Sequence, residues 1–493
     1  MTTLELAAKI EQAVRMANAP ESLSEPLLDA ILQRDPVDRV RLNPYTLAEE
    51  LAVETTVMLD IFVHGARNGL FEWGWDLICP MCGFVTQASA ESIDKTPEEA
   101  FHCALCDITA PSVLDDTVEV SFTPTPDLIA PLEDRFVDQR TYLSYYASQG
   151  SPYLDRIIHM IEKMGVGGAR LEPGAYATLS FMPKAGATYR LSCLDSHDAL
   201  TFHGAEDATA VERLTVSQSD RGFLDKEQLP DRLPTSRIEL KLINRSQSTL
   251  FNQLFEVPGC SEESDTDTDS APATEPMTAR MQAFRPRVTG KSLLNNQTFR
   301  DYYGIQKLDP NLQLKVRDLT LLFTDLKGST ELYDRTGDIE AYRLVRDHFV
   351  VLKQVVRNHA GAVVKTMGDA IMATFSSPED GVAAAVDILT GMRDYSNAIK
   401  PHELGMKLGL HRGPALTVSA GDQLDFFGQT VNIAARVQGL ASAGEICLTE
   451  MVNQSADVRS YLERYPFDVS QEEVFLKGVS ERNTIHRYTM HIE

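Results

Sequence analysis

The stretch LTLLFTDLKGST (residues 319–330) decides how this chain folds, because an apolar run ends there on a carboxylate and then turns through small residues. The apolar run is typical of a buried strand. Asp325 at its end fits either an ordinary β-to-α turn or a metal-holding carboxylate. The Gly328-Ser329-Thr330 turn would leave backbone N–H groups at a helix start, where phosphate oxygens bind.

From this strand to the C-terminus, strand-like and helix-like segments alternate. Apolar runs bounded by Gly and Asp predict strands, and apolar residues recurring every three or four positions predict helices. Together they favour an α+β sandwich with helices over a mostly antiparallel sheet. The expected elements are a strand at 319–325, helices within 330–361, a hairpin at 362–375 turning at Gly368-Asp369, a helix at 377–395, a strand at 405–413 and a helix at 430–441.

A second carboxylate, Asp369, falls at the tip of the expected hairpin. Two carboxylates at adjacent strand ends can bridge a pair of Mg²⁺ or Mn²⁺ ions, because hard cations prefer oxygen ligands. Such a pair can activate an attacking hydroxyl and neutralise a triphosphate. The second carboxylate therefore favours the metal-holding interpretation of Asp325.

Three motifs occur in order along this region: FTDLKGST (323–330), KTMGDAIMATF (365–375) and LDFFGQTVNIAARVQGLASAGEI (424–446). Together they resemble the catalytic domain of class III nucleotidyl (adenylate/guanylate) cyclases, over about residues 316–491. The resemblance implies a ferredoxin-like α/β sandwich, to which we assign residues 316–493. The preceding part of the chain resembles the N-terminal part of some bacterial members of this family.

The resemblance also assigns roles to single positions. Asp325 and Asp369 match the two metal-binding aspartates, and the backbone carbonyl of Leu326 joins them, so that each active site would hold two Mg²⁺ or Mn²⁺ ions. Lys365 and Asp425 match the pair that reads the purine. The plain alternative for Lys365 is a solvated strand residue.

The chemistry of the purine-reading pair points to ATP as the substrate. A lysine donor and a carboxylate acceptor complement the N1 acceptor and the N6 amino donor of adenine. Guanine reverses this polarity and would leave both groups unpaired. A guanylate cyclase, or a cyclase for another nucleotide, is the alternative within the same class.

Three further positions match residues that contact the rest of the nucleotide. Asn432 and Arg436 match the ribose-positioning and transition-state-stabilising residues, and a spacing of four puts both on one face of a helix. Arg436 would direct its fork of donors toward charge developing on the α-phosphate. Lys477, in LKGVSE, resembles a triphosphate-contacting lysine. The implied reaction is attack of the 3′-hydroxyl of ATP on the α-phosphate, which gives 3′,5′-cyclic AMP and pyrophosphate.

In this family the active site forms between two catalytic domains, one supplying the metal ligands and the other the purine and ribose contacts. This chain carries one such domain with both sets of residues. The resemblance therefore implies a two-fold homodimer with two equivalent sites.

The N-terminal segment, 1–78, is helical in pattern, and its end resembles a winged helix-turn-helix. Residues 1–100 carry 7 Lys and Arg against 17 Asp and Glu, a net charge of −10. A DNA-reading surface needs a basic face, so we expect a helical packing or interaction element and no DNA partner.

Two CxxC pairs, Cys79/Cys82 and Cys103/Cys106, predict a zinc ribbon over 79–110. Tetrahedral Zn²⁺ takes four thiolates, and each CxxC turn supplies two. Since no open position is left for water, the site would be structural, with one Zn²⁺ per chain. The other cysteines, Cys193, Cys260 and Cys447, lack ligand spacing and are expected to be ordinary thiols.

Between the ribbon and the catalytic region, the pattern changes twice. Segments such as 116–124, 175–183, 187–194 and 236–244 alternate apolar and polar residues, which predicts an antiparallel β-sandwich-like sensor domain over 111–258 with a helical insert at 152–164. The acidic, small-residue stretch at 259–276 predicts a linker. Connecting helices are expected at 277–315.

Composition limits the location and the partners. The net charge of −25 disfavours binding to nucleic acid or anionic membranes, and no apolar run approaches the ~18 residues that span a bilayer. The start lacks a signal-peptide pattern, so we expect a cytoplasmic protein regulated through its N-terminal region by an unidentified small molecule or protein. His411 and Arg412 are expected to be scaffold residues.

Two functions of another class stay open. One is an inactive cyclase-like domain that regulates by binding nucleotides, which the intact metal and ribose positions disfavour. The other is a zinc-ribbon and winged-helix nucleic-acid binder, which the acidic N-terminus disfavours.

Overall fold

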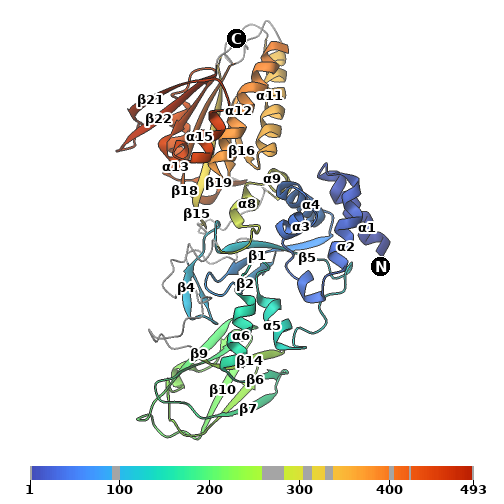
Figure 1. Cartoon of the computed structure of the whole chain (residues 1–493), viewed down its shortest axis with the longest axis vertical. Coiled ribbons are helices and arrows are strands. Elements are labelled where there is room, and N and C mark those ends of the chain that lie inside the picture. The colour runs from blue at the N-terminus through green and yellow to red at the C-terminus, as the bar shows by residue number, and fades with distance from the viewer. Residues whose placement is uncertain are drawn as a thin grey trace.

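The computed structural model describes residues 3–90, 100–257, 283–303, 314–327, 337–398, 405–420 and 423–490. The molecule is elongated, with the C-terminal α/β unit at one end, a β-sandwich at the other, and the N-terminal helices with a small sheet between them (Figure 1). The predicted linker at 259–276, Cys260 and the turn at 328–330 lie outside the described residues. Within the described ranges, no helix is both long and apolar enough to cross a membrane.

The N-terminal region is helical, as its periodicity predicts. Asn43 caps the third helix by accepting a hydrogen bond from the backbone N–H of Tyr45, and Pro44 fills the first helical position. In the core beneath, the rings of Phe62 and Phe71 stack with centroids 4.4 Å apart. The helices are α1 (Thr3–Met16), α2 (Ser24–Leu32), α3 (Pro44–Glu50) and α4 (Thr55–Arg67), with 3-10 turns at Glu21–Leu23 and Pro36–Arg39.

A small antiparallel sheet follows, in the order β2-β1-β5. Its strands are β1 (Phe71–Ile78), β2 (Val85–Ala90) and β5 (Val118–Pro124), and β3 (Ala100–Cys103) pairs with β4 (Ile108–Pro111) in a separate hairpin. The assignment of the strand within 116–124 to the middle sandwich is wrong, since Val120 lies opposite Trp75 of β1. Alternation predicts a strand but does not identify its partner.

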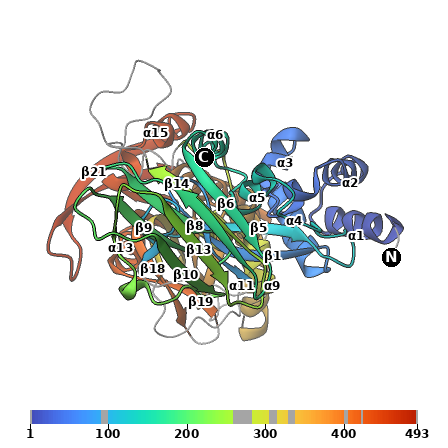
Figure 2. The same ribbon diagram turned by 90° about the horizontal axis from the view of Figure 1, so that it is seen from below.

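The middle region is the predicted β-sandwich (Figure 2). Its two sheets have the strand orders β12-β9-β8-β14-β6 and β11-β10-β13-β7. Leu191, Leu240 and Leu254 belong to the cluster of buried residues contributed by both sheets. Two strand pairs, β10–β13 and β9–β12, are parallel, so the sandwich is mostly but not entirely antiparallel. The strands are β6 (Gly165–Leu171), β7 (Tyr176–Phe181), β8 (Thr188–Cys193), β9 (Asp198–Gly204), β10 (Arg213–Ser219), β11 (Gly222–Phe223), β12 (Arg232–Leu233), β13 (Ile238–Asn244) and β14 (Leu250–Val257), and the helices before them are α5 (Gln139–Tyr146) and α6 (Leu154–Met164).

The C-terminal unit is built on a sheet ordered β16-β17-β15-β18-β20-β22-β21, with β19 paired to β18 beside this path. The only parallel pair among its described strands is β18–β20, which agrees with the mostly antiparallel sheet that the sequence predicts. The hairpin turning at Gly368-Asp369 is confirmed. The strands are β15 (Leu314–Lys327), β16 (Ala362–Met367), β17 (Ala370–Phe375), β18 (Gly405–Ala420), β19 (Gln423–Phe427), β20 (Glu445–Thr449), β21 (Phe467–Phe475) and β22 (Arg482–Met490).

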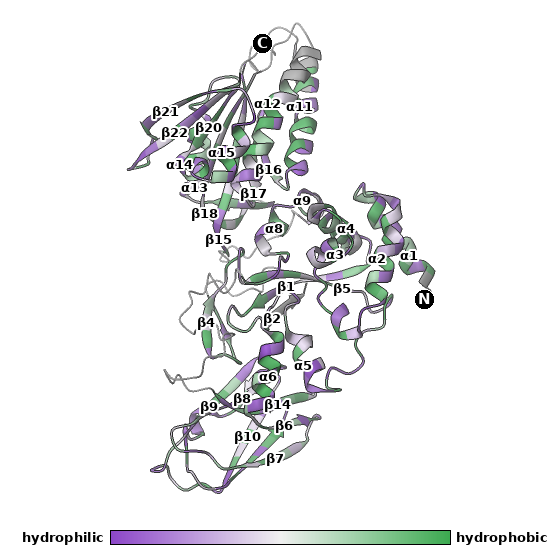
Figure 3. Ribbon diagram, in the orientation of Figure 1, coloured by the Kyte–Doolittle hydropathy of each residue, from purple (hydrophilic) through white to green (hydrophobic). Residues whose placement is uncertain are grey.

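The two faces of this sheet are covered differently. Because side chains alternate along a strand, Leu322 of β15 packs in the cluster that includes α11 and α12, whereas Leu321 and Phe323 face the opposite side. Hydrophobic and hydrophilic residues alternate along α11 and α12, as expected for helices with one buried face (Figure 3). The helices are α11 (Asp338–Asn358), α12 (Pro378–Ala398), α13 (Gln429–Gln438), α14 (Glu450–Asn453) and α15 (Ala456–Leu462).

Two short helices, α8 (Gly290–Leu294) and α9 (Gln297–Tyr303), connect the N-terminal region to this sheet. They correspond to the connecting helices expected before β15. One continuous cluster of buried apolar residues runs from Phe62 in α4 through Phe299 in α9 to Phe323 in β15. The N-terminal region and the C-terminal sheet therefore share a hydrophobic core.

Candidate active site

The two predicted metal carboxylates lie at the same edge of the C-terminal sheet. In the ladder between β15 and β17, Phe323 lies opposite Met372. The same register, continued to the end of β15, puts Asp325 beside the turn that carries Asp369. Gly368 in this turn has φ of +65°, a conformation that glycine adopts without strain.

One of these carboxylates has an oxygen that a divalent cation could satisfy. Asp325 Oδ2 accepts a hydrogen bond from Lys407 Nζ at 2.9 Å, and its side chain is about one-third exposed. Asp369 Oδ2 is buried without a hydrogen-bond partner among the described residues, which is costly unless another group satisfies it. The side chain of Leu326 is a buried hydrocarbon without a ligand atom, so only its backbone carbonyl could contribute. Oxygen donors of this kind suit Mg²⁺ or Mn²⁺.

The structure brings the predicted purine-reading residues together, although they are 60 positions apart in the sequence. Lys365 Nζ donates to Asp425 Oδ2 at 2.6 Å, and the other carboxylate oxygen accepts from the backbone N–H of Phe426 at 2.8 Å. The Asp425 side chain is 13% exposed and that of Lys365 is 36% exposed. A partly buried pair whose lysine remains accessible can exchange its mutual contact for hydrogen bonds to a ligand.

A third group forms between α13 and the turn after β21. Asn432 is exposed on α13, and Arg436 lies one turn further along the same helix. A methyl group added at Gly478 would lie 3.5 Å from Nη2 of Arg436, so the guanidinium lies against this turn. Lys477 precedes that glycine and is exposed. Two cationic side chains are thus available next to each other for an anionic ligand.

The three groups remain separate within one chain. No hydrogen bond or ion pair among the described residues joins Asp325 or Asp369 to the Lys365–Asp425 pair or to Arg436. Lys365 and Asp369 belong to one hairpin, yet Lys365 contacts β19 and Asp369 lies next to the end of β15.

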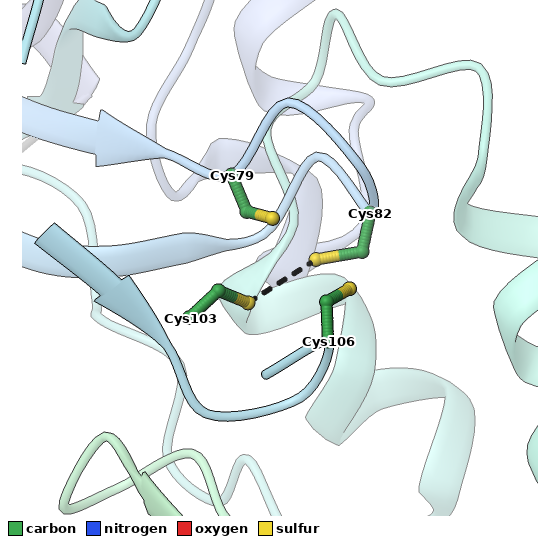
Figure 4. A group of neighbouring side chains, drawn as sticks. All are labelled: Cys79, Cys82, Cys103 and Cys106. Carbon is green, nitrogen blue, oxygen red and sulfur yellow. Dashed lines mark hydrogen bonds between the residues drawn. The ribbon is translucent and has the colours of Figure 1, made fainter. Parts of the chain in front are cut away.

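The four ribbon cysteines form a compact cluster in the structure (Figure 4). Their sulfur atoms all lie within 4.8 Å of one another, and Cys82 Sγ lies 3.7 Å from Cys103 Sγ. Zinc–sulfur bonds of about 2.3 Å in a tetrahedron put sulfur atoms about 3.8 Å apart. Donation from the Cys106, Cys79 and Cys82 thiols lowers the pKa of Cys103, whereas burial raises the pKa of Cys82. The cluster therefore has the donor set and the approximate spacing for one Zn²⁺.

The residues expected to be scaffold have scaffold contacts. His411 is buried, a ring nitrogen lies 2.8 Å from Thr449 Oγ1, and burial lowers its pKa to about 4. Arg412 forms an ion pair with Asp318. Cys193 and Cys447 are buried, and burial raises the pKa of each thiol to about 11.

Sequence reasoning missed two residues of the site. Lys407 is one of several polar residues along β18, and only the register that puts it opposite Asp325 reveals its contact. Arg300 in α9 donates a hydrogen bond to the strand that carries Asp425. A helix seven residues long, outside the recognisable motifs, offered no signal for that contact.

Comparisons with known proteins agree with this geometry. Residues 313–492 match a family described as the adenylate and guanylate cyclase catalytic domain. Residues 10–186 match a family of unknown function (DUF5939). Residues 283–303, which include α8 and α9, lie outside both matched ranges.

Individual relatives match over the same C-terminal part. The serine/threonine-protein kinase pkn2 of Myxococcus xanthus is 29% identical over 141 residues, which cover 28% of this chain and 16% of the kinase. An adenylate cyclase of Anabaena cylindrica is 28% identical over 198 residues, which cover 37% of this chain and 39% of the relative. The match thus spans well under two thirds of either relative.

Among solved structures, the adenylyl cyclase CyaB from P. aeruginosa is 19% identical with a TM-score of 0.31, covering 37% of this chain and 97% of that chain. The family match, the three motifs and the observed strand order together concern the same part of the molecule. Residues 313–492 are therefore a class III adenylate and guanylate cyclase catalytic domain.

Proposed function

We propose that this chain is an adenylate cyclase that converts ATP to 3′,5′-cyclic AMP and pyrophosphate. The observation that carries the proposal is the contact between Lys365 Nζ and Asp425 Oδ2 at 2.6 Å. It puts one donor and one acceptor side by side, at the two positions that the family resemblance assigns to the purine. Relatives named adenylate cyclase agree with this choice of class.

Adenine suits this pair better than guanine does. Lys365 would donate to N1, and Asp425 would accept from the N6 amino group. With guanine, the lysine would face the N1–H donor and the carboxylate would face the O6 acceptor. Because Asp425 is mostly buried, leaving it unpaired against guanine would be costly, which favours ATP over GTP.

Asp325, Asp369 and the carbonyl of Leu326 would hold two divalent cations. Asp369 has a buried oxygen without a partner in the part of the chain that the structure describes, which supports this assignment. Two bound Mg²⁺ or Mn²⁺ ions would supply activation of the 3′-hydroxyl and neutralisation of the triphosphate. Lys407 contacts Asp325 at 2.9 Å and would orient that carboxylate before cations bind.

Asn432, Arg436 and Lys477 would contact the ribose and the phosphates. Asn432, on the exposed face of α13, would orient the ribose so that its 3′-hydroxyl faces the α-phosphate. Arg436 would donate to oxygens that gain charge as the new bond forms. Lys477, on the turn that the Arg436 guanidinium contacts, would bind the departing pyrophosphate.

We infer that two chains share each active site in a two-fold homodimer. The separation of the metal carboxylates from the purine-reading pair and Arg436 within one chain supports this inference. The Cys79, Cys82, Cys103 and Cys106 cluster would hold one structural Zn²⁺. The N-terminal region would regulate turnover through a ligand or protein whose identity the sequence does not give.

A product assay tests the proposal. Purified full-length protein is incubated with ATP, GTP, CTP or UTP, each with Mg²⁺ or Mn²⁺, and the products are identified by mass spectrometry. We expect 3′,5′-cyclic AMP and pyrophosphate from ATP. A preference for GTP would replace adenylate by guanylate cyclase activity. Absence of any cyclic product under all conditions, with nucleotide binding retained, would favour an inactive nucleotide-binding regulator.

A further inference from the structure

Helix α9 is attached to the N-terminal region at its first turn. Asn296 Oδ1 accepts from the backbone N–H of Phe299 at 2.7 Å and so caps the helix, while its Nδ2 donates to Asp60 of α4 at 2.8 Å. The ring of Phe299 packs edge-on against Trp73 of β1, with centroids 5.5 Å apart. A shift of α4 or β1 would therefore move α9.

The same helix holds the strand that carries Lys365. Gln297 is buried, and its Oε1 accepts from the backbone N–H of Val363 at 2.8 Å. The pairing of β16 with β17 changes register between Val363 and Lys365. Such a bulge changes the direction of the side chain that follows it, here Lys365. Gln297 accepts the hydrogen bond of the backbone N–H at the bulge.

One turn further along α9, Arg300 holds the strand that carries Asp425. Its Nη1 donates to the carbonyl of Leu424 at 2.9 Å, and its Nε donates to the carbonyl of Leu294 at 2.7 Å. Its guanidinium carbon lies 5.3 Å from the ring centroid of Phe426. Arg300 thus contacts the residues on both sides of Asp425.

The charge of Arg300 also faces this carboxylate. Burial lowers the pKa of Arg300 to about 10, and the nearby Asp425 carboxylate opposes that shift, so the guanidinium is charged at neutral pH. Its Nη2 is buried and has no hydrogen-bond partner among the described residues. Within the described ranges, the guanidinium of Arg300 therefore has one donor without an acceptor.

We propose that Arg300 is a positioning residue for base recognition, which holds Asp425 toward Lys365 and links the N-terminal region to nucleotide choice. The proposal rests on the proposed function, since it assumes that Lys365 and Asp425 read the base. It adds a specificity-determining residue that lies in the connector, outside both ranges matched by known families.

Binding of unreactive nucleotides to the full-length chain tests the proposal. The probes are 3′-deoxy-ATP and 3′-deoxy-GTP with Mg²⁺, which lack the attacking hydroxyl, and inorganic tripolyphosphate with Mg²⁺, which lacks a base. Arg300→Gln should lower the ratio of affinities for the adenine over the guanine probe by about five- to tenfold. Affinity for tripolyphosphate should stay within about twofold, because the metal and phosphate contacts are unchanged.

Matched variants separate positioning from a general structural effect. Arg285→Gln makes the same change at an exposed position of the connector and should leave the ratio unchanged. Arg300→Lys keeps the positive charge but cannot donate to the carbonyls of Leu294 and Leu424 at the same time. It should therefore shift the ratio in the same direction as Arg300→Gln, but less. In an Asp425→Ala background, where no side chain is left to position, Arg300→Gln should have no further effect on the ratio.

The outcomes are distinct for the two proposals. An unchanged ratio in both Arg300 variants would overturn the positioning role, and so would an equal shift in the Asp425→Ala background. A wild-type chain that prefers the guanine probe would overturn the ATP assignment instead. Because the ratio is taken within one preparation, partial unfolding of a variant does not alter it.

Discussion

The cysteine cluster and the carboxylate pair are both predicted metal sites, but their ligand atoms are arranged differently within one chain. The four sulfur atoms already lie within 4.8 Å of one another, and three of the cysteines are fully buried. Asp325 instead contacts Lys407, and Asp369 has a buried oxygen without a partner among the described residues. Four thiolates fill a tetrahedral coordination sphere, which suits a structural ion, whereas two carboxylates leave positions for substrate. The cysteine cluster is therefore called the closed site, and Asp325 with Asp369 the open site. The comparison predicts that changes in the two regions affect different properties.

The strongest test of the comparison removes a carboxylate from the open site. Asp325→Ala should lower turnover at least about 10³-fold, because the cations that activate the hydroxyl lose a ligand. Zinc content and melting temperature should stay close to those of the wild type. Asp387→Ala, which removes an exposed carboxylate of α12, serves as the control and should retain activity. Appreciable cyclic product from Asp325→Ala would refute the metal assignment.

Mixing two inactive variants tests whether the open site is completed by a second chain. Asp325→Ala and Arg436→Ala should each be inactive alone. In a random 1:1 mixture half of the dimers are mixed, and each mixed dimer has one intact site, so activity should reach up to about one quarter of wild type. Native mass spectrometry should confirm that mixed dimers form. No recovery despite mixed dimers would mean that each chain builds its own site or that both sites must work together.

Removing a ligand from the closed site should give the opposite result. Cys82→Ser should abolish the one bound zinc ion per chain and lower the free energy of unfolding by at least about 3 kcal/mol, since structural zinc contributes about 10–16 kcal/mol in small domains. The kcat of the remaining folded protein should change less than about twofold. Elemental analysis and urea unfolding provide the measurements. Cys193→Ser, outside the cluster, should keep its zinc, and a zinc-free wild-type chain purified without chelators would contradict the assignment.

A smaller effect is expected from a buried carboxyl of the N-terminal region. Burial raises the pKa of Glu119 from 4.5 to about 7, although Arg287 and Ser148 oppose the shift. Between these values the folded state holds a proton that the unfolded state has released. The free energy of unfolding contributed by Glu119 should therefore fall as pH rises from about 4.5 to 7, by up to about 3 kcal/mol, and level off above that.

Urea unfolding at a series of pH values tests this slope. The difference in unfolding free energy between wild type and Glu119→Gln should decrease by up to about 3 kcal/mol from pH 5 to pH 8. Taking the difference cancels the opposite slope of buried histidines such as His411. Glu72→Gln, on the exposed side of β1, controls for the substitution itself. A difference that is flat with pH would show that Glu119 does not titrate in this range.

Much of the fold follows from local patterns. Alternation predicted the sandwich strands, and the Gly368-Asp369 turn predicted the β16–β17 hairpin, because both depend on neighbouring residues. The CxxC spacing predicted the cysteine cluster, since each pair sits on one turn. For the open site, the motifs selected Lys365 and Asp425, and the structure supplied their contact.

The contacts that escaped prediction depend on which strands and helices become neighbours. Lys407 faces Asp325 only because β18 pairs with β15 in one particular register. Arg300 reaches Leu424 across 124 positions, from a helix without a recognisable motif. The strand β5 alternates like the sandwich strands but pairs with β1. Periodicity describes one element at a time, so it does not contain this information.

The shared hydrophobic core has a consequence for cutting the molecule apart. A fragment beginning at residue 313 would lose α9 and the N-terminal helices, and with them the cover over Leu321, Phe323, Val364 and Met372. The apolar residues on that side that α13 does not cover would then meet water, which promotes association between copies. A fragment that begins at residue 313 should therefore aggregate or form non-native dimers.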